Sequence, residues 1–365
     1  MVLWLLLSLL TFIAMGIPIA FSIGLSSLVY LIGTGVPIAL MAQRAVMGVY
    51  SYSFLAIPFF VLSGMIMERG GTTRRLMNLS NSFVGHIKGG IAVVDIVVSM
   101  MFAALSGSGV GGTAAVGTIL IPSMKKKGYD GGFAAAIEGT SGVLASIIPP
   151  SLTIVIIGVT GGVSIGRMFF AGIIPGILAG LALIVVALII SHKRNYGGDE
   201  RSNWKTRISA ARHAVLPLLN PVIILGGIFS GIFTVTEAAV VSVVYSMILS
   251  MGIYREMSFR DLIEICFKTV RISCAILIII AISSLFGWIL TAERVPQNLT
   301  VFFSSISPNK YVFLFYINML LLLLGTFMES SALVLILIPT LLPVATAFGI
   351  DPIHFSIIFL VNLTI

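Results

Sequence analysis

The sequence predicts an all-α polytopic membrane protein with two inverted repeats, each containing a re-entrant helical hairpin and a broken helix. The first observation is composition: 58% of the 365 residues are hydrophobic and 9% are charged, and the mean hydropathy is +1.14. The second is a Gly/Ser-rich interruption inside an apolar segment, and the third is a set of short motifs that occur twice. A soluble domain has about a quarter of its residues charged, so most of this chain is expected to face lipid.

The apolar residues form about ten stretches, and a transmembrane helix needs roughly 20 mainly apolar residues. Basic residues gather between these stretches in four clusters, namely Arg69 to Lys88, Lys125 to Lys127, His192 to Arg212 and Arg255 to Arg271. Such clusters mark the cytoplasmic side of a membrane protein. The net charge of +8 is therefore explained by topology, and no nucleic-acid partner is expected.

The first repeat is expected at residues 1–190, where scaffold helices accompany an arm at 72–88, a hairpin at 89–124 and a broken helix at 131–160. Basic residues flank the hairpin at both ends, and its middle reads Ser106-Gly-Ser-Gly-Val-Gly-Gly-Thr113. Both ends should face the cytoplasm, and the second half is expected to cover only about half of a 30 Å hydrocarbon core. A re-entrant hairpin is therefore predicted. Its tip should line a site, because irregular backbone at membrane depth is tolerated only against protein or a water-filled cavity.

A second repeat is expected at residues 213–365, after a cytoplasmic basic linker at 191–212. It contains an arm at 293–309, a hairpin at 311–347 and an incomplete last helix. Both arms are too polar to span a membrane. Each is predicted to be an amphipathic helix lying along the membrane, which either frames a moving unit or simply connects its neighbours.

Short motifs relate the two repeats to each other. Ile119-Leu-Ile-Pro122 followed by Gly128-Tyr-Asp130 recurs as Ile336-Leu-Ile-Pro339 followed by Gly349-Ile-Asp351. The charge distribution opens the first hairpin from the cytoplasm and the second from the outside, so the repeats are predicted to be inverted. Inverted repeats with broken helices are typical of secondary transporters, which bind substrate and ions near the bilayer midplane.

Hydroxyl groups crowd the tip of the first hairpin. The glycines from Gly107 to Gly112 match the spacing of a dinucleotide site, but the strand and helix that such a site requires are absent from the pattern. Ser106, Ser108 and Thr113 instead offer oxygens beside backbone carbonyls, which suits a small cation such as sodium. The alternative is that these hydroxyls only bond to the preceding turn.

A tandem proline interrupts the next apolar stretch within Ala145-Ser-Ile-Ile-Pro-Pro-Ser151. Proline removes a backbone donor and clashes with an upstream carbonyl, so the helix is predicted to unwind here. The carbonyls released before Pro149 and Pro150 could complete a cation site begun by Ser106. The alternative is a kink that binds no ligand.

Four acidic residues lie within apolar stretches, and each is a functional candidate by default. Glu329 lies at the second tip and is predicted to tune an ion site, whereas Glu237 lies at a predicted turn and is expected to be exposed. Asp95 and Glu138 are interpreted as structural residues that pair with Arg or Lys near the cytoplasmic surface.

Two other functional classes fit the sequence less well. A channel should show a continuous pore with rings of charge or carbonyls, and no such repetition occurs in the sequence. An intramembrane enzyme would need a catalytic group, but no His-Glu-x-x-His motif is present and Asp95 is the only aspartate in a predicted membrane segment. A secondary transporter is therefore the predicted function.

Several motifs together resemble one known family, the large membrane subunit of tripartite ATP-independent periplasmic (TRAP) transporters. The resemblance covers essentially the whole chain and rests on Leu105-Ser-Gly-Ser-Gly109, Ile121-Pro-Ser-Met-Lys-Lys-Lys-Gly-Tyr-Asp130, Ser146-Ile-Ile-Pro-Pro-Ser151, Phe169-Phe-Ala-Gly-Ile-Ile-Pro-Gly176, Gly325-Thr-Phe-Met-Glu329 and Gly349-Ile-Asp-Pro352. It implies a sodium-driven importer of the ion transporter superfamily, in which a mobile transport domain carries substrate past a static scaffold like an elevator.

The resemblance also implies a multi-pass protein of the bacterial inner membrane that works with two partners. One is a small membrane subunit, and the other is a periplasmic binding protein that delivers an organic acid such as a C4-dicarboxylate or sialic acid. The identity of the acid does not follow from the sequence, because no obvious buried arginine is available for a carboxylate. Specificity is expected to reside largely in the binding protein.

Sodium is the coupling ion that the resemblance implies, held mainly by backbone oxygens. The residues implied by matching motif are Ser106, Ala145, Ile148 and Pro150 for one ion, and Gly325 with Met328 for a second. The Ser108 hydroxyl is a further candidate ligand. Gly109 stands where many relatives have another serine, so a side-chain ligand is replaced by a carbonyl or is absent. The chain stops inside an apolar segment at Asn362-Leu-Thr-Ile365, so the second site is expected to be incomplete and the chain truncated or its terminus missing.

Overall fold

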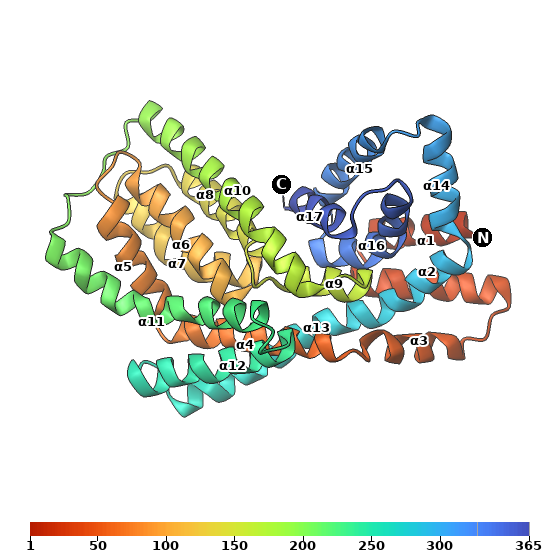
Figure 1. Ribbon diagram of the computed structural model, residues 1–365, viewed down its shortest axis with the longest axis horizontal. Coiled ribbons are helices and arrows are strands. Elements are labelled where there is room, and N and C mark those ends of the chain that lie inside the picture. The colour runs from red at the N-terminus through yellow and green to blue at the C-terminus, as the bar shows by residue number, and fades with distance from the viewer. Residues whose placement is uncertain (327, 365) are drawn as a thin grey trace. The chain divides into compact units, whose positions relative to one another are not determined.

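A computed structural model describes residues 1–326 and 328–364, and within them it contains helices joined by turns and irregular segments (Figure 1). The elements are α1 (Val2–Ala14), α2 (Ile19–Thr34), α3 (Ala39–Val49), η1 (Tyr52–Leu55), α4 (Ala56–Arg69), α5 (Thr72–Val84), α6 (Gly90–Ser106), α7 (Gly109–Lys126), α8 (Gly131–Gly142), η2 (Val143–Ser146), α9 (Leu152–Gly161), α10 (Ile165–Lys193), α11 (Trp204–Phe229), α12 (Val235–Met247), η3 (Ile248–Ile253), α13 (Phe259–Ala292), α14 (Val295–Ile306), α15 (Lys310–Gly325), α16 (Ser330–Ala347) and α17 (Pro352–Leu363). The all-α prediction is confirmed for the described residues.

The chain forms two compact units. Unit 1 comprises Met1–Leu55, Val155–Met168 and Arg271–Ile365, and unit 2 comprises Ala56–Ile154 and Phe169–Val270. Each unit takes helices from both halves of the sequence. The two compact units therefore do not coincide with the two predicted repeats, whose boundary lies near residue 190.

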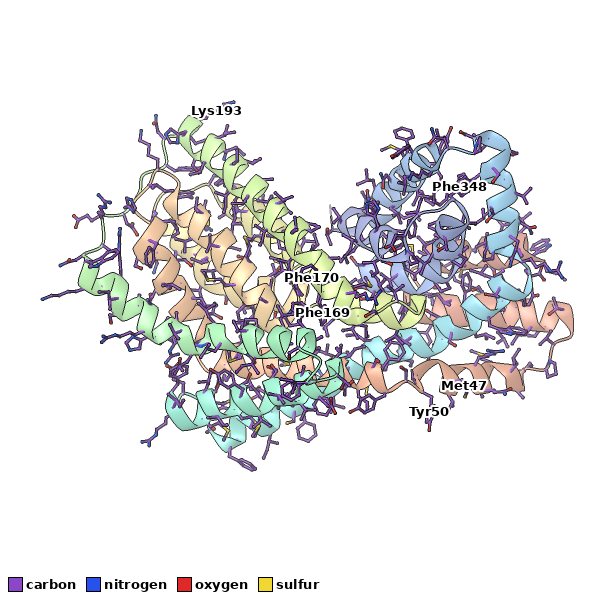
Figure 2. The ribbon with its side chains drawn as sticks, in the orientation of Figure 1. Met47, Tyr50, Phe169, Phe170, Lys193 and Phe348 are labelled. Atoms are coloured by element: carbon purple, nitrogen blue, oxygen red, sulfur yellow. The ribbon has the colours of Figure 1, made fainter. Side chains whose placement is uncertain are left out.

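Among the residues that the structure describes, six helices are long and apolar enough to cross a membrane by length and composition, and the number becomes seven if α14 and α15, which meet at 117°, form one span. Large apolar side chains are exposed on several of these helices and next to the short helix α3. Tyr50 at the end of α3 is 82% exposed, and Phe170 at the start of α10 is 67% exposed while its neighbour Phe169 is fully buried (Figure 2). Large exposed apolar side chains of this kind are suited to contact with lipid, and the chain is a multi-pass membrane protein.

The core of unit 2 is built around α6, which packs against α4, α5, α7, α8 and α11. Thirteen of its residues are buried. Small residues allow its close approach to α4, since a Cβ added to Gly64 would lie 2.8 Å from the Cα of Ser106. Such small-residue contacts are how helices associate in lipid, where van der Waals packing replaces the hydrophobic effect.

Helix α7 is longer than the sequence indicated. It begins at Gly109, inside the Gly-rich segment that was expected to be irregular, and extends over 18 residues. Its length of ~27 Å at 1.5 Å per residue approaches the thickness of a hydrocarbon core. The expectation that this half of the hairpin covers half the core is therefore wrong. The irregular backbone is confined to Gly107 and Ser108, between α6 and α7.

The recurring motifs adopt the same local structure in both halves. Gly128 follows α7 with a φ of +80° and Gly349 follows α16 with a φ of +73°, a conformation that glycine adopts without strain. Asp130 then caps α8 by accepting from the Phe133 N–H at 2.9 Å, and Asp351 caps α17 by accepting from two N–H groups. Each corner is thus fixed by a glycine and an aspartate cap.

The core of unit 1 combines α1, α2, α13 and α16 around buried residues that include Leu5, Ile23, Phe286 and Ile289. A polar contact crosses this unit, because the Tyr30 hydroxyl of α2 donates to a Glu293 carboxylate oxygen after α13 at 2.5 Å. Aromatic rings fill the space among α14, α15 and α17. Phe313, for example, stacks on Phe348 with ring centroids 4.9 Å apart.

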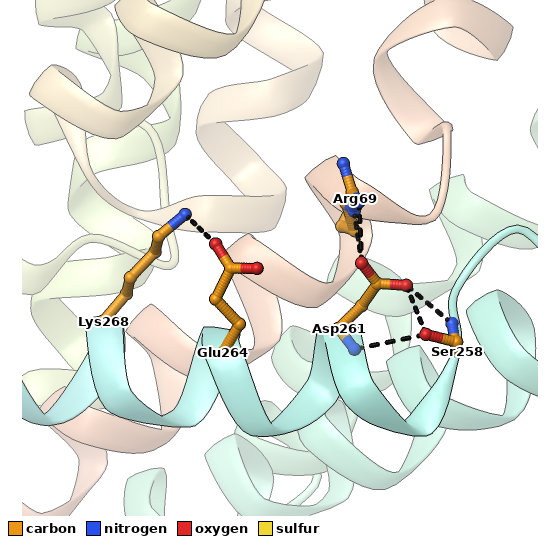
Figure 3. Close-up of polar contacts among 5 residues, drawn as sticks. All are labelled: Arg69, Ser258, Asp261, Glu264 and Lys268. Carbon is orange, nitrogen blue, oxygen red and sulfur yellow. Dashed lines mark hydrogen bonds and ion pairs between the residues drawn. The ribbon is translucent and has the colours of Figure 1, made fainter.

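Within unit 2, a polar network joins the end of α4 to the first turn of α13 (Figure 3). Asp261 accepts hydrogen bonds from the Ser258 N–H at 3.0 Å and from the Ser258 hydroxyl at 2.6 Å. The same carboxylate pairs with Arg69 at 2.6 Å. One turn further, Glu264 and Lys268 form an exposed ion pair at 2.7 Å. Asp261 therefore both supports the start of α13 and ties α4 to it.

Asp261→Ala is expected to lower the melting temperature of the purified protein, because it removes the bonds to Ser258 and the Arg69 ion pair together. Glu264→Ala is the matched control on the next turn, and it removes only an exposed pair of the kind that contributes little. Thermal unfolding followed by fluorescence measures both. Equal melting temperatures for the two variants would contradict a structural role for the Asp261 network.

Candidate functional site

The tip of the first hairpin is a tight two-residue connection between α6 and α7. Gly107 ends α6 in the left-handed conformation with a φ of +61°. Ser108 caps α7, and its hydroxyl accepts from the Gly111 N–H at 3.3 Å. Ser106 is 6% exposed, and its hydroxyl makes only long contacts of 3.4 to 3.5 Å with the backbone of Ser108. The Ser106 hydroxyl is therefore weakly bonded and faces the tip.

The tandem proline lies in a break between α8 and α9, as predicted. After α8 the backbone forms the short 3-10 helix η2 and is then irregular over residues 147–151. The Ser151 hydroxyl donates to the carbonyl of Ser146 at 2.6 Å and so bridges the break. The Pro149–Pro150 peptide bond is cis. Backbone carbonyls are thus released from helical pairing in the middle of an apolar segment.

The hairpin tip and the helix break lie directly against each other inside unit 2. The N–H of Leu152, the first residue of α9, donates to the carbonyl of Gly107 at 3.1 Å. A Cβ on Gly107 would lie 2.7 Å from the carbonyl oxygen of Pro150, so only glycine fits at this contact. A Cβ on Gly109 would likewise lie 3.4 Å from the carbonyl oxygen of Gly142. The structure thus gathers carbonyl oxygens from two chain segments around the hydroxyl-rich tip.

The residues expected around the first sodium ion lie on these two segments. Ser106 and Ser108 flank the tip, Pro150 contacts Gly107, and Ala145 is buried in η2, two residues before the break. Ile148 differs, because its side chain packs against Gly176 of α10, and only its backbone is available to the site. Their arrangement is consistent with ligation through backbone oxygens, which remains a prediction.

The tip of the second hairpin lies in unit 1 between α15 and α16. Gly325 ends α15, and a Cβ added to it would lie 3.9 Å from the carbonyl oxygen of Asn362 in α17. The Ser330 hydroxyl donates to the carbonyl of Leu363 at 3.4 Å. This tip therefore faces the end of α17, just as the first tip faces the end of the α8 segment. Phe327, part of the motif here, lies outside the described residues.

Glu329 and Met328 have local roles at this second tip. The Glu329 carboxylate caps α16 by accepting from the Ala332 N–H at 3.2 Å and from the Ser331 hydroxyl at 2.8 Å. It is exposed, and tuning of an ion site stays a prediction. The Met328 side chain packs against the core of unit 1, so its contribution to an ion site would come from its backbone.

Asp95 and Glu138 do not pair with basic residues, so the predicted pairing is wrong. Both are buried, with exposures of 0% and 1%, and their carboxyl groups lie against each other between α6 and α8. The Ser141 hydroxyl donates to Asp95 at 3.3 Å. Neither carboxyl group forms an ion pair with Arg or Lys within residues 1–326 and 328–364. Both carboxyl groups are buried in the interior of unit 2, so the basic side chains at its surface do not reach them. Glu237, in contrast, is exposed at the start of α12 as expected.

Sequence reasoning missed two residues that shape the first site. Gly64 of α4 allows the helix to touch Ser106, and the N–H of Leu152 bonds to the tip. The Ser63-Gly64 pair inside an apolar span is the signal that marks such close approach. A main-chain donor such as that of Leu152 leaves no mark in the sequence.

Comparison with known proteins gives a consistent family match. The model of the family described as "Tripartite ATP-independent periplasmic transporter, DctM component" matches residues 6–365. The chain is 41% identical to a sialic acid TRAP transporter large permease of Vibrio cholerae over 96% of this chain and 82% of that protein. It is 42% identical to a C4-dicarboxylate TRAP transporter large permease of Pseudomonas aeruginosa over 86% and 74%. An isethionate TRAP transporter permease of Oleidesulfovibrio alaskensis is 40% identical over 97% and 56%.

Gly107→Ala is expected to destabilise the protein and to weaken its transport activity. The left-handed conformation costs a non-glycine residue about 1–2 kcal/mol, and the new methyl group also collides with the Pro150 carbonyl. Gly128→Ala is the matched control, because Gly128 has a φ of +80° with nothing within 4 Å of an added Cβ. The difference between the melting temperatures of the two variants measures the cost of the contact with the Pro150 carbonyl. An equal decrease in melting temperature in both variants would contradict the importance of this contact.

Proposed function

We propose a transport mechanism from the premise that this chain belongs to the DctM component family of tripartite ATP-independent periplasmic transporters. It is therefore a transporter permease subunit and not an enzyme. The proposal is that it imports an organic acid across the bacterial inner membrane, together with a small membrane subunit and a periplasmic binding protein. Relatives named for sialic acid, C4-dicarboxylate and isethionate transport motivate the class of substrate.

Sodium is proposed as the coupling ion, and one observation carries this part of the proposal. It is the contact between the Gly107 tip and the Pro150 break, where irregular backbone from two segments meets in the interior of unit 2. Sodium is a hard cation that is suited to carbonyl and hydroxyl oxygens, and broken helices supply such carbonyls in transporters. Ser106, Ser108, Ala145, Ile148 and Pro150 are the proposed ligand residues.

A second sodium ion is proposed at the other tip, near Gly325 and Met328. The support is the parallel between the two hairpins, since each tip lies against the helix that follows its own hairpin and corner. The same parallel supports inverted repeats and the elevator mechanism, in which a mobile transport domain carries substrate past a static scaffold. With two coupling ions, the uptake rate is expected to depend on the sodium concentration with a Hill coefficient above one.

Reconstitution in vesicles with both partner proteins tests the coupling. Uptake of a labelled organic acid is expected to require an inward sodium gradient and to stop when a sodium ionophore collapses that gradient. A potassium gradient of equal size is the control for ionic strength and osmotic effects. Uptake that continues unchanged after the collapse would overturn sodium coupling.

Ser106→Ala is expected to raise the sodium concentration needed for half-maximal uptake by about 3- to 10-fold, since one hydrogen-bond-strength contact is worth about 1 kcal/mol. Ser123→Ala is the matched control on the same hairpin, because the Ser123 hydroxyl bonds back to the carbonyl of Ile119 at 2.8 Å. The melting temperature of each variant checks folding. A sodium dependence that is identical in all three proteins would mean that the Ser106 hydroxyl serves only the local backbone.

A further inference from the structure

A cavity of about 400 Å³ lies within unit 1, and neither Gly325 nor Met328 is among its lining residues. Its walls come from α3, α9, α13 and α16, and they include Arg44, Thr160, Ser283, Ser284 and Trp288. Ligand pockets for small molecules have volumes of about 300–1,000 Å³ and combine apolar walls with a few placed polar groups. The cavity meets both conditions, so its polar groups indicate what it would bind.

Arg44 gives the cavity a positive charge that no described carboxylate balances. Arg69 and Arg75 each pair with an acidic residue at 2.6 Å, whereas no such pair includes Arg44 within the described part of the chain. Its guanidinium instead lies over the Trp288 ring, 5.2 Å from the centroid, and the side chain is half-buried. A guanidinium in this state presents a planar fork of N–H donors that matches a carboxylate or sulfonate.

The contact between α3 and α13 holds Arg44 in place. Arg44 and Gly48 are four residues apart on one face of α3, and Ser284 and Trp288 are four residues apart on one face of α13. Gly48 approaches Ser284 so closely that an added Cβ would lie 2.4 Å from the Ser284 Cβ, while Arg44 covers Trp288. Glycine at 48 therefore lets the helices touch and sets the guanidinium at the cavity wall.

Ser283 adds an unused donor to the same cavity. It is 3% exposed, and its hydroxyl has no hydrogen-bond partner among the described residues. Nearby Thr291 behaves as helical hydroxyls usually do, because it donates to the Gly287 carbonyl at 2.9 Å. Buried polar groups are nearly always bonded, so an unbonded hydroxyl in a cavity wall indicates a ligand acceptor that would complete it.

We propose that this cavity is a binding site for the acidic group of an organic anion, a carboxylate or a sulfonate, which pairs with Arg44 and accepts from Ser283. The site gives the imported acid of the proposed function a place to bind in unit 1, and the inference rests on that function for the identity of its ligand. Arg44 was overlooked in the sequence because it lies in the short helix α3, outside the long apolar spans.

Trp288 provides a direct readout of binding, because its indole forms a wall of the cavity under Arg44. The chain contains three tryptophans, so the full chain with Trp4→Phe and Trp204→Phe reports on Trp288 alone. Titration of this protein with succinate, N-acetylneuraminate and isethionate is expected to give a saturable fluorescence change for at least one anion. Succinamide, which has the size of succinate without its charge, is expected to give none.

Arg44→Gln is expected to weaken the apparent affinity in this titration at least tenfold, and Arg44→Lys, which keeps the charge but loses the fork, is expected to weaken it less. Arg294→Gln is the matched control, because Arg294 is exposed and lies outside the cavity. Equal affinity in Arg44→Gln and the parent protein would overturn the proposal. A response of equal size to chloride, or no response to the three acids, would overturn it as well.

The binding titration and the uptake assay fail independently. If Arg44→Gln loses the Trp288 response while uptake by the parent protein does not depend on the sodium gradient, the binding site is supported and the sodium coupling is overturned. Sodium-driven uptake with the same KM in Arg44→Gln and the parent protein, together with an unchanged Trp288 response, would overturn this site and keep the coupling.

Discussion

The requirement that main-chain polar groups find partners inside the protein governs this structure. Lipid offers no hydrogen bonds, so the free N–H and C=O groups of a helix that ends at membrane depth must form hydrogen bonds with another part of the chain. The first hairpin and the break after α8 solve this problem for each other, because the Leu152 N–H bonds to the Gly107 carbonyl. The glycine-rich tip, the proline-rich break and the buried surface of α6 all serve to bring these two interruptions together.

The sequence was sufficient for the main elements of the fold. Composition and basic clusters predicted a polytopic helical protein, and glycine and proline marked both hairpins and the break, because these residues act through local backbone geometry. The corners at Gly128 and Gly349 were recognised as a repeated sequence motif. The structure explains the motif, because each corner needs a glycine with a positive φ followed by an aspartate that caps the next helix.

Other features depended on tertiary packing and could not be read from the sequence. Helix α7 begins at Gly109 because the Ser108 cap starts it there, although its glycines predicted an irregular segment. Asp95 and Glu138 were predicted to pair with basic residues, because the sequence does not show that α6 and α8 pack against each other and bury both carboxyl groups. Likewise, Arg44 became a candidate only when α3 and α13 were seen to place it over Trp288. The proposed sodium ligands are mostly carbonyls, which every residue possesses.

The corner between α7 and α8 has a mechanical consequence. Gly128 and Asp130 fix its backbone, and Tyr129 stacks on Tyr196 from the segment after α10, with ring centroids 4.0 Å apart. A corner held at three successive residues transmits force and does not absorb it as a hinge would. The hairpin and α8 are therefore expected to move as one rigid piece, so that in the proposed mechanism an ion bound at the hairpin tip would keep its ligands during transport.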